Sequence, residues 1–151
     1  MSAPMPSVPA LAQHRLHDWM PRLAAVVVAR MGAPFVWGLH DCCVFAADCV
    51  QAVTGRDLGA DLRGSYRTER EAARLLHRLG GVASLAADRL GPVVPAASAA
   101  PGDIGLCRLN GRDCLAVCVG GHFLAPGHCG LVAIGLPDIA RAWRCTGQAH
   151  G

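Results

Sequence analysis

A chain of 151 residues is long enough to form one domain with a hydrophobic core. Apolar residues make up 52% of it and charged residues 17%, which is below the average of about 25% for soluble domains. The formal net charge of +3 is too small to indicate a nucleic-acid partner, and no basic cluster is interleaved with aromatic residues. The low charged fraction suggests that part of the surface is covered in an assembly, and a monomer with a weakly charged surface is the alternative.

No apolar run approaches the length of about 18 residues that a membrane-spanning helix requires, so we expect no membrane span. The first residues lack a basic segment followed by an apolar one, and we therefore predict no signal peptide. In such a chain, eight cysteines indicate reduced thiols in a cytosol rather than disulfides. Residues 1–13, rich in Pro, Ala and Ser, are predicted to form a flexible or docking arm before a single domain over residues 14–151.

The first half of the chain predicts helices. Asp41 is a typical N-cap and Gly55 a typical stop signal, and the residues between them are apolar on almost every face, which indicates a buried central helix. Thr68 to Glu71 forms a capping box at the start of another helix. The expected helices run over His14–Met31, Cys42–Thr54, Thr68 to Gly80, and Val82–Leu90.

The second half predicts strands, and residues 92–103 a loop that leads into them. Asn110-Gly111 between two apolar runs is a strong signal for a β-hairpin. Helices followed by an antiparallel meander give an α+β fold with a sheet of four to five strands. The expected strands are Ile104–Leu109, Cys114–Val119, His122–Ala125, Leu131–Ile134 and Ala142–Cys145.

The predicted strand Cys114–Val119 is apolar on both faces. The central helix can cover one face. We expect another helix or a partner subunit to cover the other.

Several short motifs follow one another in a distinctive order. PFVWG (34–38) precedes an Asp-Cys at a helix start, PGDI (101–104) opens a strand, and CLAVCVG (114–120) forms the next strand. This order resembles the NlpC/P60 branch of the papain-like cysteine peptidases, which cleave peptide stems or crosslinks in bacterial cell walls. The similarity covers about residues 18 to 135. It is greatest to a subgroup from the tails of phages and phage-like particles, on the motifs at Trp37–Asp48 and Ala142–Arg144.

By this resemblance, Cys42 matches the catalytic nucleophile. The residues support the assignment independently, because a thiol in the first turn of a helix is stabilised as thiolate by the helix dipole and by free backbone N–H groups. The same N–H groups could bind an oxyanion. The negative charge of Asp41 acts in the opposite direction, since it raises the pKa of a neighbouring thiol.

The resemblance places Cys114 where the family has its general-base histidine. A thiol cannot replace an imidazole as a base near neutral pH, so the chain is expected to have lost most peptidase activity. His122 and His40 are the two candidates for a substitute base. Trp37 is expected to pack as a wedge between helix and sheet, with a substrate platform as the alternative.

We expect no cofactor and no metal ion, since no cysteine pair has the C-x-x-C spacing of a structural zinc site. The alternative is a soft site at Cys42, Cys114 and Cys118, with His122 or His128 as a further ligand.

The resemblance implies a structural component of a phage tail tip or baseplate, built on a degenerate peptidase fold. Such a protein would be assembled in the bacterial cytoplasm, reside in the virion tail and contact other tail-tip or baseplate proteins. The first alternative is an active tail-associated cell-wall endopeptidase that acts on peptidoglycan with Cys42 as nucleophile. The second is a metal-binding or redox protein built on clustered thiols.

Overall fold

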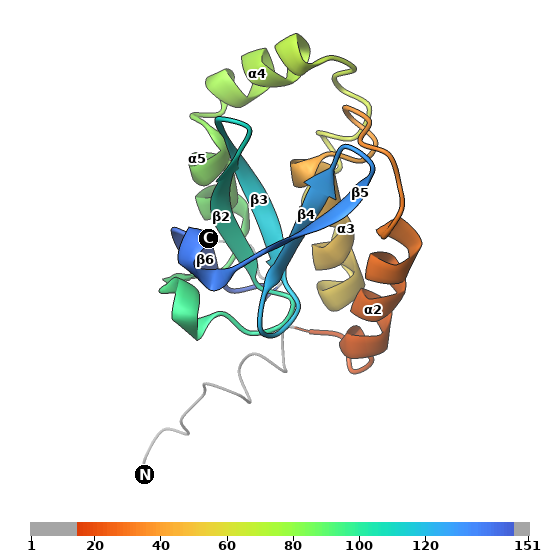
Figure 1. Ribbon diagram of the computed structural model, residues 1–151, viewed down its shortest axis with the longest axis vertical. Coiled ribbons are helices and arrows are strands. Elements are labelled where there is room, and N and C mark those ends of the chain that lie inside the picture. The colour runs from red at the N-terminus through yellow and green to blue at the C-terminus, as the bar shows by residue number, and fades with distance from the viewer. Residues whose placement is uncertain (1–14, 147–151) are drawn as a thin grey trace.

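The computed structural model describes residues 15–146, and the predicted arm over residues 1–13 lies outside them. The fold is α+β: four N-terminal helices pack against a six-stranded antiparallel sheet with the strand order β1-β6-β2-β3-β4-β5 (Figure 1). The helices are α2 (Trp19–Arg30), α3 (Cys42–Thr54), α4 (Glu69–Arg78) and α5 (Val82–Arg89). The strands are β1 (Val93–Val94), β2 (Ile104–Leu109), β3 (Arg112–Cys118), β4 (Phe123–Gly127), β5 (Gly130–Ile134) and β6 (Arg141–Trp143).

The local signals of α3 give its bounds correctly. Asp41 caps its first turn, and Gly55 ends it in the left-handed conformation. The α-helix predicted from His14 begins only at Trp19, because Arg15 is buried and the carboxylate of Asp18 accepts from the Arg22 side chain instead of capping the helix.

The sheet has one strand more than the upper number predicted. Within the segment 92–103, which was expected to be only a loop, Val93 and Val94 form β1 and pair with Trp143 and Ala142 of β6. A run of two residues is too short to show a periodic pattern in the sequence. This strand forms because β6 is present to pair with it. The predicted hairpin is confirmed: β2 and β3 pair around Asn110-Gly111, and both turn residues have positive φ angles.

Helix α3 lies against one face of the sheet and is buried on nearly all sides, as its sequence predicts. Phe45, Cys49 and Val53 have no exposed surface, and they pack in one cluster with Ile104 of β2 and Val117 of β3. The main core of the domain therefore lies between α3 and the middle strands.

The second face of the sheet is buried within the chain, and the expected further helix is represented only by the short 3-10 helix Ala96–Ser98, whose Ala96 packs against this face. Phe123, Ile134 and Ile139 pack there against Ala116 of β3. Gly105 makes this possible: a Cβ at that position would lie 2.8 Å from the Phe123 ring.

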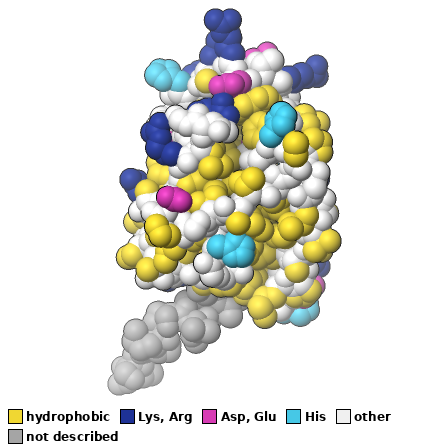
Figure 2. All heavy atoms as spheres, viewed as in Figure 1, with side chains coloured by type: hydrophobic (Ala, Val, Ile, Leu, Met, Phe, Trp, Pro, Cys, Tyr) yellow, Lys and Arg dark blue, Asp and Glu magenta, His cyan; other side chains and the backbone are white. Residues whose placement is uncertain are grey.

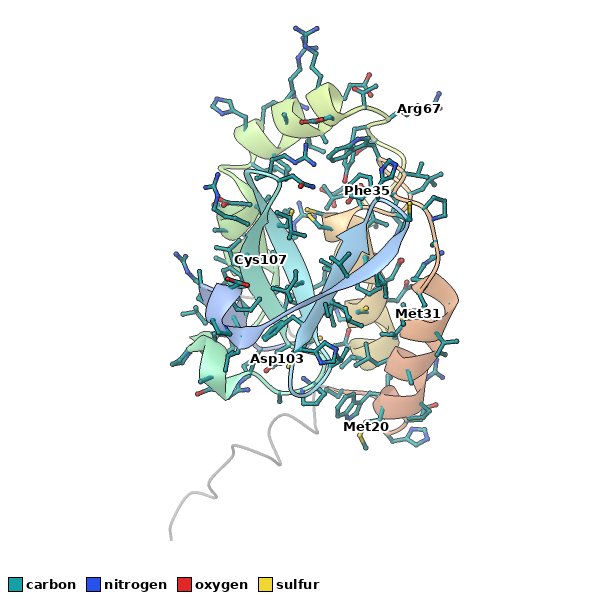
Figure 3. The ribbon with its side chains drawn as sticks, viewed as in Figure 1. Met20, Met31, Phe35, Arg67, Asp103 and Cys107 are labelled. Atoms are coloured by element: carbon teal, nitrogen blue, oxygen red, sulfur yellow. The ribbon has the colours of Figure 1, made fainter. Side chains whose placement is uncertain are left out.

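A buried carboxylate ties the two ends of the described chain together. Asp103 accepts hydrogen bonds from the guanidinium groups of Arg15 at 3.1 Å and Arg144 at 2.9 Å. It also accepts from the backbone N–H groups of Ala100 and Cys145, both at 2.9 Å. The PGD and AWR motifs are thus two halves of one structural clasp, at the lower end of the sheet in Figure 3. Among the helices of residues 15–146, none is long and apolar enough to cross a membrane.

Candidate functional site

A cleft of about 350 Å³ lies at the end of the sheet where α3 begins. Cys42, the first residue of α3, and Cys114, near the start of β3, both line it, together with Trp37, Arg112 and His128. In Figure 1 the start of α3, the β2–β3 hairpin and the β4–β5 turn all lie at the upper end of the molecule, beneath α4. The segments that carry the candidate residues are far apart in sequence and meet only here.

The start of α3 is held by Asp41, whose side chain is buried. One carboxylate oxygen accepts from the backbone N–H groups of Cys43 and Val44, both at 3.0 Å. The other accepts from the Gly38 N–H and the Tyr66 hydroxyl, both at 2.8 Å. With these four bonds the Asp41 carboxylate caps the helix and anchors the preceding loop. Burial, and then the negative charge of Asp41, raise the pKa of Tyr66, so the Tyr66 hydroxyl stays protonated and donates.

Gly38 explains the Trp-Gly pair that precedes this cap. Its φ angle is +82°, and a Cβ there would lie 2.1 Å from the backbone oxygen of Tyr66. Only glycine combines this conformation with such a close approach. The loop therefore brings the Gly38 N–H to Asp41 and places Trp37 beside Cys42 in the wall of the cleft.

Trp37 lines the cleft and also packs against the main core cluster between α3 and the sheet, as the expected wedge would. Its ring is half-buried and packs edge-on against Phe35 with a centroid separation of 4.7 Å. The Arg112 guanidinium lies 5.2 Å from its centroid and pairs with Glu69 at the start of α4. Aromatic rings and one ion pair thus form the wall on this side.

The Cys42 thiol has two sulfur neighbours. Its sulfur lies 4.0 Å from that of Cys43, and the Cys114 thiol, in the wall of the same cleft, is near enough to affect its pKa. The Cys114 thiol lowers the pKa of Cys42, but the Cys43 thiol and burial outweigh it, and the pKa stays well above its ordinary value. The Cys42 thiol and burial also raise the pKa of Cys114. Both groups are therefore neutral thiols at neutral pH, the poorly nucleophilic form.

Neither of the two histidines proposed as substitute bases lines this cleft. His122 is exposed in the β3–β4 turn, where its backbone oxygen accepts from Val119. Figure 1 shows this turn at the lower end of the sheet, opposite the start of α3. His40 is buried with its ring against Phe45, and neither ring nitrogen has a hydrogen-bond partner. Burial, and then the positive charge of Arg30, lower its pKa and keep it neutral.

His128 is the imidazole that the cleft does contain, and sequence reasoning considered it only as a metal ligand. It is exposed in the turn between β4 and β5, and its backbone oxygen accepts from the N–H of Phe35 at 3.4 Å. Strand register explains its position: Val117 pairs with Leu124, so continuing the β3–β4 ladder places Cys114 opposite the residue before His128. A prediction of the β3–β4 register from the sequence would have identified His128 as a residue of the cleft.

The alternative metal site at Cys42, Cys114 and Cys118 is not assembled. Cys118 is buried near the other end of β3, about 13 Å along the strand from Cys114, where its thiol donates to the Gly120 oxygen. Over residues 15–146, no group of three His, Cys, Asp or Glu side chains is placed to hold a metal ion.

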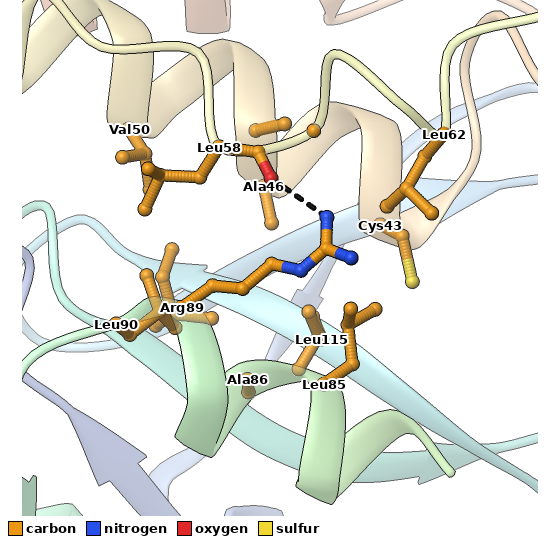
Figure 4. Close-up of a pocket in the computed structure, with 13 residues that line it drawn as sticks. Cys43, Ala46, Val50, Leu58, Leu62, Leu85, Ala86, Arg89, Leu90 and Leu115 are labelled. Atoms are coloured by element: carbon orange, nitrogen blue, oxygen red, sulfur yellow. Dashed lines mark hydrogen bonds between the residues drawn. The ribbon is translucent and has the colours of Figure 1, made fainter. Parts of the chain in front are cut away.

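Asp48 and Cys43, two further residues of the motif at Trp37–Asp48, make structural contacts. Asp48 pairs with Arg63 at 2.6 Å and with Arg30 at 3.3 Å. Cys43 faces a separate apolar cavity of about 40 Å³ between α3 and α5, which Arg89 crosses to donate to the backbone oxygen of Leu58 (Figure 4). Cys42 and Cys43 therefore line different cavities, although their sulfurs lie 4.0 Å apart.

Residues 14–145 match the model of a protein family described as a domain of unknown function, DUF6950. The chain belongs to the DUF6950 family. A search of the curated proteins finds no significant match. The matched range of this DUF6950 domain includes the cleft with Cys42, Cys114 and His128 as well as the clasp around Asp103.

Proposed function

We propose that this DUF6950 domain is a non-catalytic component of a phage or phage-like tail tip or baseplate, built on a degenerate papain-like fold of the NlpC/P60 type. The α+β architecture, with a cysteine at the start of a buried helix that packs on an antiparallel sheet, supports the fold assignment. The tail assignment depends on the motif resemblance at residues 37–48 and 142–144. The proposal places the protein in the virion tail after assembly in the bacterial cytoplasm.

The presence of Cys114 beside Cys42 in the wall of one cleft is the observation that carries the non-catalytic part of this proposal. In a cysteine peptidase the group beside the nucleophile is an imidazole that removes its proton. Here that group is a second thiol, whose pKa is raised by the Cys42 thiol and by burial. A neutral thiol beside a neutral thiol supplies no base, whereas the cleft and its aromatic wall remain and could still hold a peptide.

A surface of α2 supports a role in an assembly. Met20, Val28 and Met31 are 64%, 74% and 53% exposed, and Met20 and Met31 lie near opposite ends of the helix in Figure 3. Figure 2 shows hydrophobic side chains spread over the middle and the right side of the viewed face, which includes α2. Exposed apolar patches of this kind are typical of interaction surfaces. We propose that a neighbouring tail protein covers this side.

The tail assignment predicts that the protein is found in particles. Phage or phage-like particles from the encoding bacterium would be purified by density gradient and analysed by quantitative mass spectrometry. We expect peptides of this chain at a fixed ratio to other tail proteins, as for a structural subunit. A chain that stays in the cell lysate while the tail proteins enter the gradient fraction would refute the assignment.

A second candidate function is an active cell-wall endopeptidase, and one observation favours it. His128 lines the same cleft as Cys42 and comes from an exposed turn. If its imidazole takes the Cys42 proton, the thiolate attacks a peptide carbonyl, the amine leaves with a proton from the imidazole, and water hydrolyses the acyl-enzyme. Peptidoglycan stem peptides are the substrate that the resemblance implies.

Digestion of peptidoglycan fragments separates the two functions. Wild type, Cys42→Ala and His128→Ala would be incubated with purified muropeptides under reducing conditions, and the products read by mass spectrometry. We expect no new peptides from any of the three proteins. Cleavage by wild type that disappears in both variants would instead establish the endopeptidase with His128 as its base. An equivalent exposed histidine, His122, provides the matched control, since His122→Ala should behave as wild type in either case.

A further inference from the structure

Two half-buried cysteines line the wall of the cleft. Of the eight cysteines in the chain, five are buried and Cys129 is exposed, which leaves Cys42 and Cys114 as the intermediate pair. Both line the same cleft, and each thiol is near enough to affect the pKa of the other. We propose that Cys42 and Cys114 are an oxidisable dithiol, and that a disulfide between them joins the start of α3 to the start of β3. This inference does not depend on the tail assignment.

Cys43 is the nearest competitor for Cys42, but a bond between adjacent cysteines does not fit this helix. Consecutive Cα atoms lie about 3.8 Å apart, whereas disulfides span Cα distances of about 4.4 to 6.8 Å. A bond between the two would therefore distort the first turn of α3, which Asp41 holds through the N–H groups of Cys43 and Val44. The Cys43 side chain also faces the apolar cavity rather than the cleft (Figure 4).

Cys107 is the competitor for Cys114, because the two are directly opposite in the β2–β3 ladder. Directly opposed residues in an antiparallel pair have Cβ atoms about 4.5 to 5.5 Å apart, against a mean of about 3.8 Å in disulfides. Cys107 is also only 2% exposed, on the covered face of the sheet, and does not line the cleft. A dissolved oxidant in the cleft therefore meets Cys42 and Cys114 and not Cys107.

A disulfide of low molecular mass, such as glutathione disulfide, is the oxidant that the chemistry requires. The Cys42 thiolate attacks one sulfur of glutathione disulfide, and glutathione leaves as a thiolate that takes up the proton. The Cys114 thiolate then attacks the Cys42 sulfur of the mixed disulfide and releases a second glutathione. The protein thus loses two thiol hydrogens and gains one S–S bond, while one glutathione disulfide is reduced to two glutathiones.

Formation of this bond has three measurable consequences. The pair would be reduced in a cytosol and would oxidise in a less reducing environment. The bond closes a long loop between residues 42 and 114, so we expect the Tm to rise by about 5 °C or more. Because attack requires a thiolate and the pKa of Cys42 is raised, oxidation should be faster at pH 8.5 than at pH 7.

The test is oxidation of the full chain in buffers with increasing ratios of glutathione disulfide to glutathione. Free thiols are then blocked by alkylation, the monomer is isolated, and tryptic peptides are analysed by mass spectrometry. We expect a disulfide between the peptides that span residues 31–56 and 113–141. Cys42→Ser and Cys114→Ser should each abolish it, whereas Cys43→Ser and Cys107→Ser should retain both the link and the increase in Tm.

The exposed Cys129 is an internal control, because its conversion to a glutathione adduct shows that the oxidant was active. The proposal would be overturned if Cys129 is modified while Cys42 and Cys114 remain free. It would also be overturned if Cys42 carries only glutathione, or if the link is lost in Cys43→Ser or Cys107→Ser, since the bond would then involve a different pair.

Discussion

Replacement of Asp41 by alanine is expected to lower the free energy of unfolding by about 3–5 kcal/mol. The carboxylate is 2% exposed and accepts four hydrogen bonds, two from the first turn of α3 and two from Gly38 and Tyr66. Loss of a helix cap costs about 1 kcal/mol. The buried Gly38 N–H and Tyr66 hydroxyl lose their acceptor as well, and each such group adds about 1–3 kcal/mol. Urea unfolding followed by circular dichroism measures the effect.

Thr68 provides the matched control for this prediction. It caps α4 through a single bond to the N–H of Glu71 and is exposed. Thr68→Ala should therefore cost only about 1 kcal/mol. If Asp41→Ala costs no more than Thr68→Ala, Asp41 is an ordinary cap and the interpretation of the buried network is wrong. In a folded Asp41→Ala protein, Cys42 should also react faster with a thiol reagent, because the start of α3 is loosened.

Removal of Asp103 is expected to destabilise the domain by a similar amount, about 3–5 kcal/mol. The side chain has no exposed surface, and its partner Arg15 has a side chain that is 3% exposed. Asp103→Ala leaves the Arg15 guanidinium buried without its counter-charge and removes the acceptor of the Cys145 N–H. Arg15 still donates to the Pro101 and Cys145 oxygens, which limits the loss but does not neutralise the charge. Thermal and urea unfolding of the variant measure the loss in the free energy of unfolding.

Two further variants make this second prediction specific. Asp61 pairs with Arg89 at 2.6 Å but is 61% exposed, so Asp61→Ala should cost less than about 1 kcal/mol. Arg15→Met in the Asp103→Ala background should recover part of the lost stability, because it removes the unpaired buried charge. A double variant that is less stable than Asp103→Ala would show that the cost comes from lost packing of Arg15 on Trp19 and not from its charge.

Features that depend on neighbouring residues were predictable from the sequence. Asp41 and Gly55 define the bounds of α3, the Thr68 cap opens α4, and Asn110-Gly111 forms the hairpin. Each depends on a hydrogen bond or a φ angle within a few positions of the residue that signals it. The placement of Cys42 at the start of a buried helix follows from the same signals, and so do the α+β class and most of the strands.

Features that depend on residues distant in sequence were decided only by the tertiary structure. β1 forms because β6 is present to pair with it, and the second face of the sheet is covered because Gly105 admits the Phe123 ring. Strand pairing also decided which histidine lies near Cys42. The β3–β4 register places His128 in the cleft, whereas His122 lies at the other end of the sheet.

The geometry of the cleft depends both on local sequence signals and on tertiary packing. The sequence by itself determined that Cys42 begins a buried helix, because the cap and the apolar pattern are local. Only the tertiary structure decided that its neighbour is the Cys114 thiol, since β3 reaches α3 through strand pairing and core packing across some seventy intervening positions. Local signals set where a helix begins, but the chemistry of a site depends on which distant side chains the packing brings together.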